Sequence, residues 1–571
     1  MKLRFDFADS PYFFSHPKQI IQTSTIADIL PCLARIEQEV QKGHYAAGFI
    51  SYEAAAAFRP YLQTHSVGSL PLIWFGIFDQ PVDASIFVDT EPSKQSMIYP
   101  QWQPNISWEE YQSAIQAIKD HIAKGDTYQV NYTLQMKAAF QQDPYAFYLH
   151  LLQAQQSRYS AYIESDHFQI LSASPELFFE VNHGTILTKP MKGTASRGMN
   201  NAQDLLQQQI LHNEKNHAEN LMITDLLRND LGQIAQQGTV KVTSLFDAEK
   251  YPTVWQLTST ITAQLKDYTT LTDIFTALFP CGSITGAPKA NTMKIIQALE
   301  KSPRDVYCGA IGVITPNDQA IFSDPIRTMV IQDQQATYGV GGGITWDSTP
   351  QDEYQEVFHK MQVLYQSKVP EHLLESLLLE DGKYFLYDEH FQRLKSSAIY
   401  FDFAFHQDEI ERALQQLKDK YSAGRWKVRL LLDKKGAIEC EAQSITLLTS
   451  PLYASWAENS VQSDNVFLYH KTTKRDFYPK VTLDYEILLF NEKNEVTEFV
   501  NGNFVWFNQG EWFTPPLQSA LLNGTMRQHL LAQGKIKERI IYKKDLQETC
   551  KIAFINSVRG WRDVVWKQEK N

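Results

Sequence analysis

The strongest constraint on the fold is a helical segment that leads directly into a strand-like segment at residues 107–133. In "SWEEYQSAIQAIKDHIAKGDTYQVNYT", the apolar residues Tyr111, Ile115 and Ile118 recur near the helical period. Gly125 ends this pattern, and the following "TYQVNYT" alternates as strands do. We therefore expect helices and β-sheets mixed along the chain, in an α/β or α+β fold.

Other segments carry one of the two patterns. Amphipathic helices are predicted at 217–234, 286–300 and 351–366, and a buried strand running into a helix at 43–58. Pro288 is expected in the first turn of its helix, where a missing N–H costs nothing. "VYCGAIGVITP" and "ATYGVGGGITW" are predicted to be buried strands broken by glycines. The first part of the chain should therefore be β-sheets flanked by helices.

A new pattern begins near residues 367–370. Pro370 interrupts the preceding helix, and a strand, a turn at Asp381–Gly382 and a second strand follow. The junction is short and poor in Gly and Ser, so it is not a flexible tether. We predict a larger domain at 1–366 and a smaller one at 371–571, since 571 residues suffice for several domains.

Composition excludes several protein classes. The net charge of −12 argues against nucleic acid, whose binding needs clustered Lys and Arg. No apolar run reaches the ~18 residues of a membrane helix, and the N-terminus lacks a signal-peptide core. The five cysteines are scattered and form no CxxC pair, which argues against zinc and against a disulfide framework. These features predict a reduced, cytoplasmic enzyme without nucleic-acid or membrane partners.

Four segments of the first domain carry candidate chemistry. "PMKGTASRG" holds Lys192, "KNHAENLMITDLLRND" holds Glu219, "PCGSITGAPK" is a small-residue turn, and "GGGITWDSTPQDEYQEVFHK" holds Glu353, Glu356 and Lys360. Taken singly, each segment has a purely structural explanation, such as a surface ion pair of Glu356 and Lys360 at helical spacing. Together, two carboxylate-bearing helices and glycine turns suit Mg²⁺ with an anionic ligand.

In their order along the chain, these segments resemble the chorismate-binding enzymes, which include the anthranilate, aminodeoxychorismate, isochorismate and salicylate synthases. The matching stretches also include "GDTYQVNYT", "SASPELFF", "YCGAIG" and "DPIRT". The detailed resemblance runs from about residue 100 to 366.

The resemblance implies roles for individual residues. Glu219 and Glu356 would ligate Mg²⁺ directly, and Asn216 and Glu353 would act through water in an outer layer. The implied substrate-binding residues are Tyr307, Arg327, Gly341, Gly342, Gly343, Lys360 and Thr285. Gln256 stands where the family pattern has a histidine, and a glutamine cannot serve as a general acid.

Lys192 distinguishes between members of the family. A lysine in this motif is typical of the aminodeoxychorismate synthases, whereas the anthranilate synthases carry another residue there. The resemblance implies that Lys192 attacks C2 of chorismate and displaces the C4 hydroxyl, after which ammonia adds at C4 and expels the lysine. The amine must be neutral to attack, and burial near the metal site would lower its pKa.

The source of ammonia is not evident within the chain. None of the contexts of Cys32, Cys281, Cys308, Cys440 and Cys550 resembles the nucleophile elbow of a class I amidotransferase. We therefore expect free ammonia, or ammonia from a separate glutamine amidotransferase subunit, as the resemblance implies.

The second domain carries another set of motifs. "YHKTTKRDFY", "NEVTEFVNGNF", "LLNGTMR", "DEHFQRL" and "FINSVRG" together resemble the fold-type IV pyridoxal phosphate enzymes, which include class IV aminotransferases and aminodeoxychorismate lyase. The resemblance implies that Lys471 forms the Schiff base and that Glu498 faces the pyridine nitrogen. The implied phosphate-binding residues are Arg393, Gly524, Thr525, Met526 and Ser557.

The two resemblances imply one route. The first domain would convert chorismate and ammonia into 4-amino-4-deoxychorismate, and the second would eliminate pyruvate to give 4-aminobenzoate, a folate precursor. Two alternatives remain open: an anthranilate synthase fused to an aminotransferase, and a synthase whose second half is a degenerate docking module.

Overall fold

The computed structural model describes residues 1–7, 11–87, 99–365, 368–446, 452–547 and 549–567. The chain forms two compact units, which are residues 1–196 with 208–367, and residues 197–207 with 368–571. The junction between residues 367 and 368 lies at the expected boundary near 367–370, of which residue 367 is outside the described ranges. The assignment of 197–207 to the second unit is a feature that the sequence patterns did not predict.

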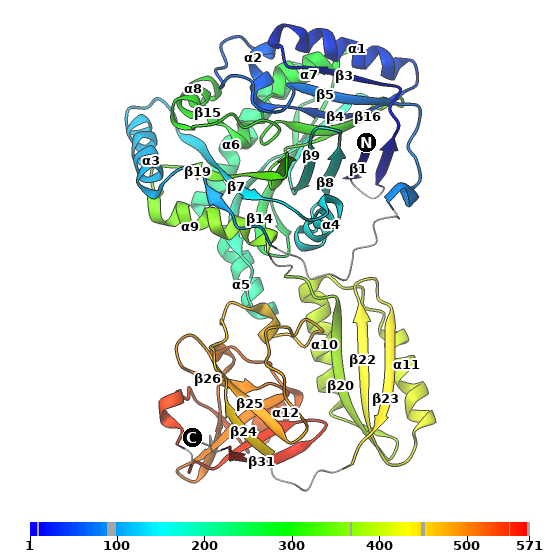
Figure 1. Ribbon diagram of the computed structural model, residues 1–571, viewed down its shortest axis with the longest axis vertical. Helices are drawn as coiled ribbons and strands as arrows, with labels where there is room; N and C mark the ends of the chain where they lie inside the picture. Colours follow the sequence, from blue (N-terminus) through cyan, green and yellow to red (C-terminus); the bar gives the residue numbers. More distant parts are fainter. Residues whose placement is uncertain (8–10, 88–98, 366–367, 447–451, 548, 568–571) are drawn as a thin grey trace. The chain divides into compact units, whose positions relative to one another are not determined.

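The first unit is built on two antiparallel sheets (Figure 1). One has the order β15 (Gly286–Ala287), β7 (Gln129–Ala139), β19 (Gln335–Ile344), β18 (Thr328–Gln332), β9 (Gln169–Ser174), β8 (Tyr159–Glu164), β1 (Lys2–Phe7) and β2 (Tyr12–Ser15), with β6 (Gln103–Pro104) beside β7. The other has the order β12 (Met191–Ser196), β14 (Val254–Gln264), β11 (Thr185–Lys189), β10 (Leu177–Asn182), β17 (Gln319–Ser323), β16 (Ala310–Thr315), β4 (Tyr45–Ile50), β5 (Ile73–Phe78) and β3 (Gln19–Thr23), with β13 (Lys241–Lys250) beside β14.

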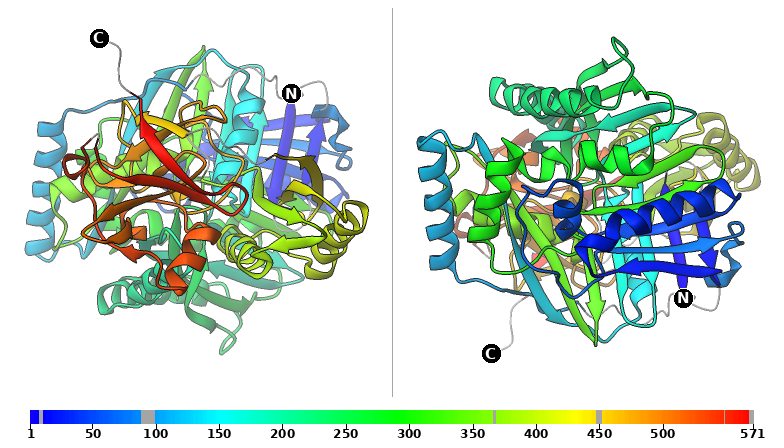
Figure 2. Two further views of the ribbon diagram at one scale, coloured as in Figure 1. Left: turned by 90° about the horizontal axis from the view of Figure 1, so that it is seen from below. Right: turned by 90° about the horizontal axis from the view of Figure 1, so that it is seen from above.

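Helices cover both sheets of this unit, as predicted. The first sheet packs against α3 (Trp108–Ala123), α4 (Pro144–Gln155), α8 (Lys289–Leu299) and α9 (Pro350–Met361). The second packs against α1 (Ile29–Gln41), α6 (Glu214–Gly232) and α7 (Leu271–Leu278), and Figure 2 shows α1 lying across its strands. A third apolar cluster, with Phe5, Phe49 and Ile163, joins strands of the two sheets. The central strands of both sheets are therefore buried on two faces, whereas β12 and β13 at the edge of the second sheet remain partly exposed.

The predicted helices are present, with one correction at a helix start. Ser107 caps α3 in a reciprocal capping box with Glu110, which explains why that helix begins there. The prediction that Pro288 lies in the first turn of a helix over 286–300 is wrong. Gly286 and Ala287 form the strand β15, Pro288 is extended at the N-cap, and α8 begins at Lys289. Pairing of β15 with β7 takes precedence over the helical pattern.

The second unit contains two further sheets. One has the order β21 (Lys383–Phe385), β20 (His372–Glu380), β22 (Arg425–Asp433) and β23 (Ile438–Ser444), and packs on α10 (Tyr387–Phe401) and α11 (Gln407–Lys420). The other has the order β26 (Val496–Phe499), β25 (Tyr485–Phe490), β24 (Leu452–Trp456), β31 (Gly560–Trp566), β30 (Ile552–Asn556), β27 (Gly502–Asn508), β28 (Glu511–Thr514) and β29 (Lys537–Glu538), with α12 (Thr525–Ala532) against β30. The predicted turn at Asp381–Gly382 joins β20 to β21, and both residues have positive φ.

The remaining helices are short or shared. They are α2 (Ala55–Phe58) and α5 (Asn201–Leu211), of which the latter spans the junction of the two units at residue 207. Over the ranges that the structure describes, every helix is too short or too polar to cross a membrane.

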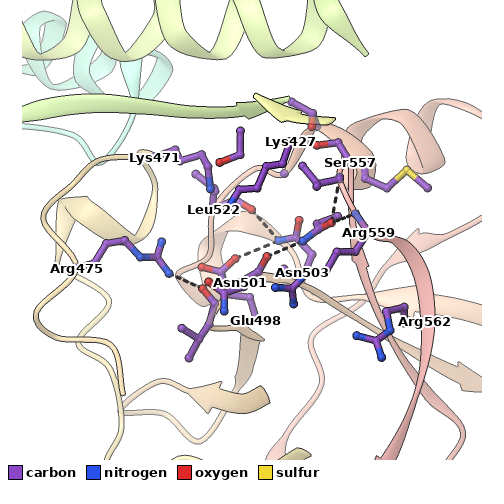
Figure 3. Close-up of a pocket in the computed structure, with 18 of the residues that line it drawn as sticks. Lys427, Lys471, Arg475, Glu498, Asn501, Asn503, Leu522, Ser557, Arg559 and Arg562 are labelled. Carbon is purple, nitrogen blue, oxygen red and sulfur yellow. Dashed lines mark hydrogen bonds between the residues drawn. The ribbon is translucent and has the colours of Figure 1, made fainter. Parts of the chain in front are cut away.

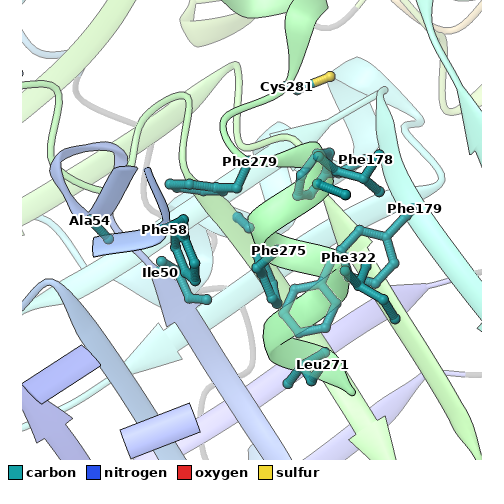
Figure 4. Close-up of a cluster of buried hydrophobic side chains, with 14 of the residues drawn as sticks. Ile50, Ala54, Phe58, Phe178, Phe179, Leu271, Phe275, Phe279, Cys281 and Phe322 are labelled. Atoms are coloured by element: carbon teal, nitrogen blue, oxygen red, sulfur yellow. The ribbon is translucent and has the colours of Figure 1, made fainter. Parts of the chain in front are cut away.

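An aromatic cluster forms much of the core behind the second sheet (Figure 4). Phe275 of α7 is fully buried, and its ring lies 5.2 Å from that of Phe322 and 5.4 Å from that of Phe179. Edge-to-face rings at such distances add to the free energy gained from burial alone. The cluster therefore fixes α7 against the sheet.

Replacing Phe275 with alanine should destabilise the first unit by about 3–5 kcal/mol, because a large buried ring is removed and its cavity closes only partly. Thermal or urea unfolding of the variant measures this loss. Tyr268, which is 97% exposed, provides the matched control, and Tyr268→Ala should leave the unfolding midpoint unchanged. Equal midpoints for native protein and Phe275→Ala would contradict the packing argument.

Candidate functional sites

The first unit contains a cavity of about 310 Å³ that collects most of the predicted residues. The predicted residues in its lining are Lys192, Asn216, Glu219, Gln256, Tyr307, Arg327, Gly341, Gly342, Gly343, Glu353, Glu356 and Lys360. These residues come from β12, α6, β14, β19, α9 and the loops beside them. The tertiary structure therefore brings together segments that are up to 168 residues apart in the sequence (Lys192 to Lys360).

Thr285 is the exception. It is fully buried, its Oγ1 donates to the carbonyl of Cys281 at 3.0 Å, and it is not part of the cavity lining. Ser283 and Ile284 of the same turn line the cavity instead. Because the turn is a short 3₁₀ segment followed by β15, it also lacks the helix N-terminus that was expected to face the ligand.

Lys192 lies on β12 with its side chain in the cavity wall. Burial lowers the pKa of its amine, and the nearby carboxylates of Glu176 and Glu219 offset this only in part. Asn220 of α6 links β12 to β14, since its Nδ2 donates to the carbonyls of Lys192 at 3.3 Å and Leu257 at 3.1 Å. The lysine is thus placed on rigid backbone and has a larger neutral fraction than an exposed amine.

Glu176 is a site residue that the sequence patterns did not single out. It lines the same cavity, and its Oε1 accepts from the backbone N–H of Met191 at 3.4 Å. Burial raises its pKa, and Ser283 and Lys192 oppose the rise. In the sequence, Glu176 stands in "SASPELFF", one of the stretches that resemble the chorismate-binding enzymes, and this position indicated that it lies near the site.

A second buried carboxylate stands behind Glu176. In the described part of the chain, ligand atoms of Glu176, Cys281 and Asp324 lie within 4.8 Å of one another, and all three residues are buried. Burial first, and then the charge of Glu176, raise the pKa of Asp324 well above its usual range. Two carboxyl groups this close and this buried each disfavour ionisation of the other, and the pKa of both is raised although the charge of Lys192 opposes the rise.

The carboxylates predicted to bind magnesium line the same cavity, but Glu356 and Glu353 are each bound to other side chains. Glu356 is paired with Lys360 at 2.6 Å, and Glu353 Oε1 accepts from Ser348 Oγ at 2.6 Å. Asn216 Nδ2 donates to the carbonyl of Leu211 at 2.8 Å. The lysine lowers the pKa of Glu356, so this carboxylate is ionised and available to a cation.

The glycine run of β19 lets two strands and a ring approach closely. A Cβ on Gly341 would meet the carbonyl oxygen of Tyr132 at 2.1 Å, and one on Gly339 would meet the ring of Tyr307 at 2.4 Å. Lys360 Nζ donates to the carbonyl of Gly341 at 2.8 Å. Any larger residue would displace the strand, so the run is required by packing as well as by the cavity.

The second unit contains a cavity of about 450 Å³, and Figure 3 shows side chains converging on it. All the predicted residues of this unit line it, namely Arg393, Lys471, Glu498, Gly524, Thr525, Met526 and Ser557. Burial, followed by the charges of Arg393 and Arg475, lowers the pKa of Lys471 to about 7. The amine can therefore change its protonation state near neutral pH.

Glu498 is a buried carboxyl group in the lining of this cavity. It accepts from Tyr478 Oη and from Asn503 Nδ2, both at 3.2 Å. Burial raises its pKa to about 8, because the neighbouring hydrogen bonds and cations do not replace the lost water. A cationic ring nitrogen placed against this carboxyl would stabilise its ionised form.

A charged network positions Arg393. Its guanidinium pairs with Glu375 through Nε at 2.8 Å and Nη2 at 2.6 Å, and Glu375 also accepts from His390 at 2.6 Å. Burial alone would raise the pKa of Glu375, but Arg393 and His390 lower it to about 2. The other ring nitrogen of His390 meets Ser557 Oγ at 2.9 Å and Thr525 Oγ1 at 3.2 Å. One network therefore connects most of the predicted phosphate-binding residues.

Several cations of this cavity were not predicted. Lys427, Arg475, Arg559 and Arg562 line it together with Asn501. Burial and the neighbouring guanidinium groups lower the pKa of Lys427. These residues come from β22, from the segment after Lys471 and from β31 and the turn before it, so no local pattern connects them. Their shared charge favours an anionic ligand.

Comparison with known proteins identifies the family of the first unit. The model of chorismate binding enzymes matches residues 13–366. The chain belongs to the chorismate-binding enzyme family. The model of class IV aminotransferases matches residues 372–565, in agreement with the resemblance of the second unit.

Two curated relatives are similar to the first unit. Aminodeoxychorismate synthase component 1 of Klebsiella aerogenes is 42% identical over 267 residues, which is 46% of this chain and 59% of the relative. The protein of the same name from Escherichia coli is 40% identical over 271 residues, or 47% and 60%. The chain therefore spans about 60% of the length of these relatives.

A solved structure supports the fold. Anthranilate synthase component I from Streptococcus pneumoniae aligns with a TM-score of 0.55 and 24% identity, over 64% of this chain and 92% of that one. The expected fold is thus confirmed: the larger part has the chorismate-binding fold, and the smaller part after it matches the class IV aminotransferase model.

Gly524 offers a test of the second cavity. A Cβ at this position would lie 1.9 Å from Asn503 Oδ1, so Gly524→Ala should displace the amide that donates to Glu498. Binding of pyridoxal phosphate should then weaken by about ten-fold or more, which corresponds to ~1.4 kcal/mol. Gly232→Ala, which would place a methyl in open space on α6, is the control. Unchanged affinity in Gly524→Ala would contradict the assignment of this turn.

Proposed function

We propose that the chain makes 4-aminobenzoate in two steps. The first unit converts chorismate and ammonia into 4-amino-4-deoxychorismate, and the second removes pyruvate from that product. The observation that carries the proposal is a half-buried lysine with a lowered pKa in the wall of each cavity, Lys192 in one and Lys471 in the other. The family of the first unit and the names of its relatives support the first step.

Lys192 would act as the nucleophile of the first step. Its Nζ forms a bond to C2 of chorismate while the two conjugated ring double bonds shift, from C1=C2 and C5=C6 to C1=C6 and C4=C5, and the C4 hydroxyl leaves. Ammonia then forms a bond to C4, both double bonds shift back and the C2–N bond to the lysine breaks. Two moderate barriers thus replace one substitution that free ammonia accomplishes poorly.

Glu176 is suited to move the protons of this step. The attacking amine must lose a proton, and the C4 hydroxyl must gain one to leave as water. Glu176 faces Lys192 and has a raised pKa, so it can accept the first proton and supply the second. Glu176 would thus perform the proton transfer that the family's histidine could perform. At that histidine's position this chain has Gln256, whose Oε1 accepts from Thr194 Oγ1 at 3.1 Å.

The donor set of the first cavity fits Mg²⁺. Glu219 and Glu356 would hold the ion, with Glu353 and Asn216 acting through water, since hard oxygen ligands and room for waters suit this ion. When bound, the ion would supply positive charge for a substrate carboxylate. Arg327 and Lys360, in the same lining, would orient the anionic substrate.

The nitrogen source is proposed to lie outside this chain. Cys32, Cys281 and Cys308 are buried, and none of the five cysteines stands in a nucleophile-elbow motif. The relatives are each called component 1, which supports a second component. We propose a separate glutamine amidotransferase, with ammonium salts as a substitute in the test tube.

The second cavity fits pyridoxal phosphate. Lys471 would link to the cofactor, Glu498 would face its ring nitrogen, and the network of Arg393, Ser557 and Thr525 would hold its phosphate. When bound, the cofactor would take up the electrons of a broken C–H bond at the amine-bearing carbon. Lys471, with a pKa of about 7, would remove that proton from C4, and the enolpyruvyl group would leave from C3.

The unpredicted cations suit this substrate. 4-Amino-4-deoxychorismate carries two carboxylates, and Lys427, Arg475 and Arg559 enter the cavity from different elements. Separate cations can bind the ring carboxylate and the enolpyruvyl carboxylate at the same time. This arrangement favours a lyase substrate over an ordinary apolar amino acid.

Product analysis with chorismate, ammonium, Mg²⁺ and pyridoxal phosphate decides between the alternatives. The proposal expects 4-aminobenzoate and pyruvate. Anthranilate as the main product would favour the synthase–aminotransferase alternative. Accumulated aminodeoxychorismate without 4-aminobenzoate would favour a degenerate second half, although the convergence of Lys471, Glu498 and Arg393 on one cavity argues against this.

Lys192→Ala should nearly abolish formation of aminodeoxychorismate, because the covalent route is lost while the fold stays intact. Glu176→Gln should slow the same step by about 10²–10⁴-fold, the usual contribution of a general acid–base. Both effects are measured as chorismate consumption with ammonium. Asp305→Asn serves as the control, since this half-buried carboxyl accepts from the backbone N–H groups of Ser69 and Leu70. A native rate in Lys192→Ala would refute the nucleophile.

The native synthase rate should rise with pH and level off below the usual pKa of a lysine, because only the neutral amine attacks and burial lowers the pKa of Lys192. A profile of the chorismate-consuming step with ammonia concentration held constant checks this. A rate that still rises at the ordinary lysine pKa of ~10.4 would contradict the buried amine.

Lys471→Ala should stop release of 4-aminobenzoate while chorismate is still consumed, because the two units carry separate lysines. Aminodeoxychorismate should accumulate, and an independent lyase should convert it to 4-aminobenzoate. Liquid chromatography of the reaction mixture measures all three compounds. Release of 4-aminobenzoate at the native rate would show that the second unit is not a lyase of this type.

A further inference from the structure

Residues 197–207 belong to the second unit although the matched chorismate-binding region surrounds them in the sequence. Arg197 follows directly after β12, and α5 begins at Asn201. The segment is closed on itself, because Asp204 Oδ1 accepts from Arg197 Nε at 2.6 Å and from the backbone N–H of Gly198 at 3.0 Å. Arg197 and Asp204 are both buried. A buried ion pair of this kind defines one conformation of the loop.

Tyr400, near the end of α10, is the residue on which this segment rests. The guanidinium of Arg197 lies 4.4 Å from the centre of the Tyr400 ring, and its Nη2 donates to the carbonyl of Tyr400 at 3.0 Å. In the opposite direction, Tyr400 Oη donates to the carbonyl of Gly198 at 2.6 Å. Asn201 Nδ2 adds a bond to the carbonyl of Ser396 at 2.8 Å. The segment therefore holds the last turn of α10 through several independent contacts.

The Tyr400 ring also contacts the residue next to the proposed cofactor lysine. The ring of His470 lies 4.5 Å from that of Tyr400, and His470 Nδ1 is 2.9 Å from Ser397 Oγ on the same helix. Burial lowers the pKa of His470 to about 4, so the ring is neutral and serves as a packing surface. Lys471 follows at once, and its carbonyl accepts from the backbone N–H of Leu374 at 3.0 Å.

Helix α10 connects the two parts of the proposed cofactor site, namely the phosphate network and the residues that support Lys471. Its first turns hold His390 and Arg393, which belong to the phosphate network, and its last turn holds Ser397 and Tyr400. A shift of its C-terminal end would move the support of Lys471 and change the direction of the helix that presents Arg393. The position of these two groups thus depends on what holds Tyr400.

We propose that residues 197–207 act as a clamp on Tyr400 that positions Lys471, through His470, together with Arg393. This inference rests on the proposed binding of pyridoxal phosphate to the second unit. Arg197, Asp204 and Tyr400 are positioning residues, since none of them lines the cavity. It follows that the lyase site is complete only with a segment taken from the middle of the chorismate-binding sequence.

The test uses the full chain and three tyrosine variants. Tyr400→Leu removes the ring and the hydroxyl, Tyr400→Phe removes only the bond to Gly198, and Tyr384→Leu is the control. Tyr384 packs on the same apolar cluster, and its Oη donates to the carbonyl of Leu414 on α11 at 2.8 Å rather than to residues 197–207. The measurements are pyridoxal phosphate affinity by titration of the apoprotein, circular dichroism of the cofactor absorption band, melting temperature and chorismate consumption.

Tyr400→Leu should weaken cofactor binding by about ten-fold or more and change the circular dichroism of the cofactor band, which reports its orientation. Tyr400→Phe should recover most of both. Tyr384→Leu should lower the melting temperature and leave the affinity and the band unchanged. Chorismate consumption should stay native in all three, because the first cavity is not involved.

Asp204→Asn provides a second approach if Tyr400→Leu fails to fold. It keeps the side-chain volume and removes the charge that holds Arg197, so it should weaken cofactor binding in the same direction. Native affinity and a native band in Tyr400→Leu or in Asp204→Asn would overturn the clamp, as would equal changes in Tyr384→Leu. A native chain that binds no pyridoxal phosphate at all would instead refute the proposed function, and the clamp with it.

Discussion

Both sites depend on one physical constraint, which is the partial removal of a lysine amino group from water. An exposed lysine is protonated at neutral pH and is a poor nucleophile or base. In this chain, burial lowers the pKa of Lys192, and it lowers the pKa of Lys471 to about 7. Each lysine is held by rigid backbone, through Asn220 in the first unit and through the bond to Leu374 in the second. Both side chains are half-buried, so the surrounding elements remove part of the water that would otherwise favour the charged amine.

The same lack of water determines the state of the carboxyl groups around the lysines. Glu176 and Asp324 lie close together, and burial together with their mutual repulsion raises the pKa of Asp324 well above its usual range. In the second unit, Glu498 has a pKa of about 8 until a cation reaches it, whereas Glu375 is held ionised by Arg393. Carboxyl groups of one chemical type therefore differ in charge state, which suits the roles proposed for Glu176 as a proton carrier and for Glu498 as the partner of a ring nitrogen, while Glu375 anchors Arg393.

The division of the chain into units does not follow the sequence order. Residues 197–207 leave the first unit directly after the strand of Lys192 and pack beneath the helix that ends at Phe401. Their ion pair is satisfied within the segment, and their contact with Tyr400 lies in the second unit. A boundary drawn only at residues 367–370 would thus separate residues 197–207 from the helix that they contact.

The sequence by itself determined the elements and most of the site membership. Apolar periodicity predicted helices such as α3 and α9, the Asp381–Gly382 turn was recognisable from its two residues, and ordered motifs placed Lys192, Glu219 and Lys471 in named roles. These features depend on neighbours in the chain. Only the tertiary structure decided that Glu176 faces Lys192, that Thr285 is buried away from the cavity and that residues 197–207 pack on Tyr400. Those outcomes depend on side chains that meet across sheets and helices, where burial and close approach, rather than local pattern, control position and charge.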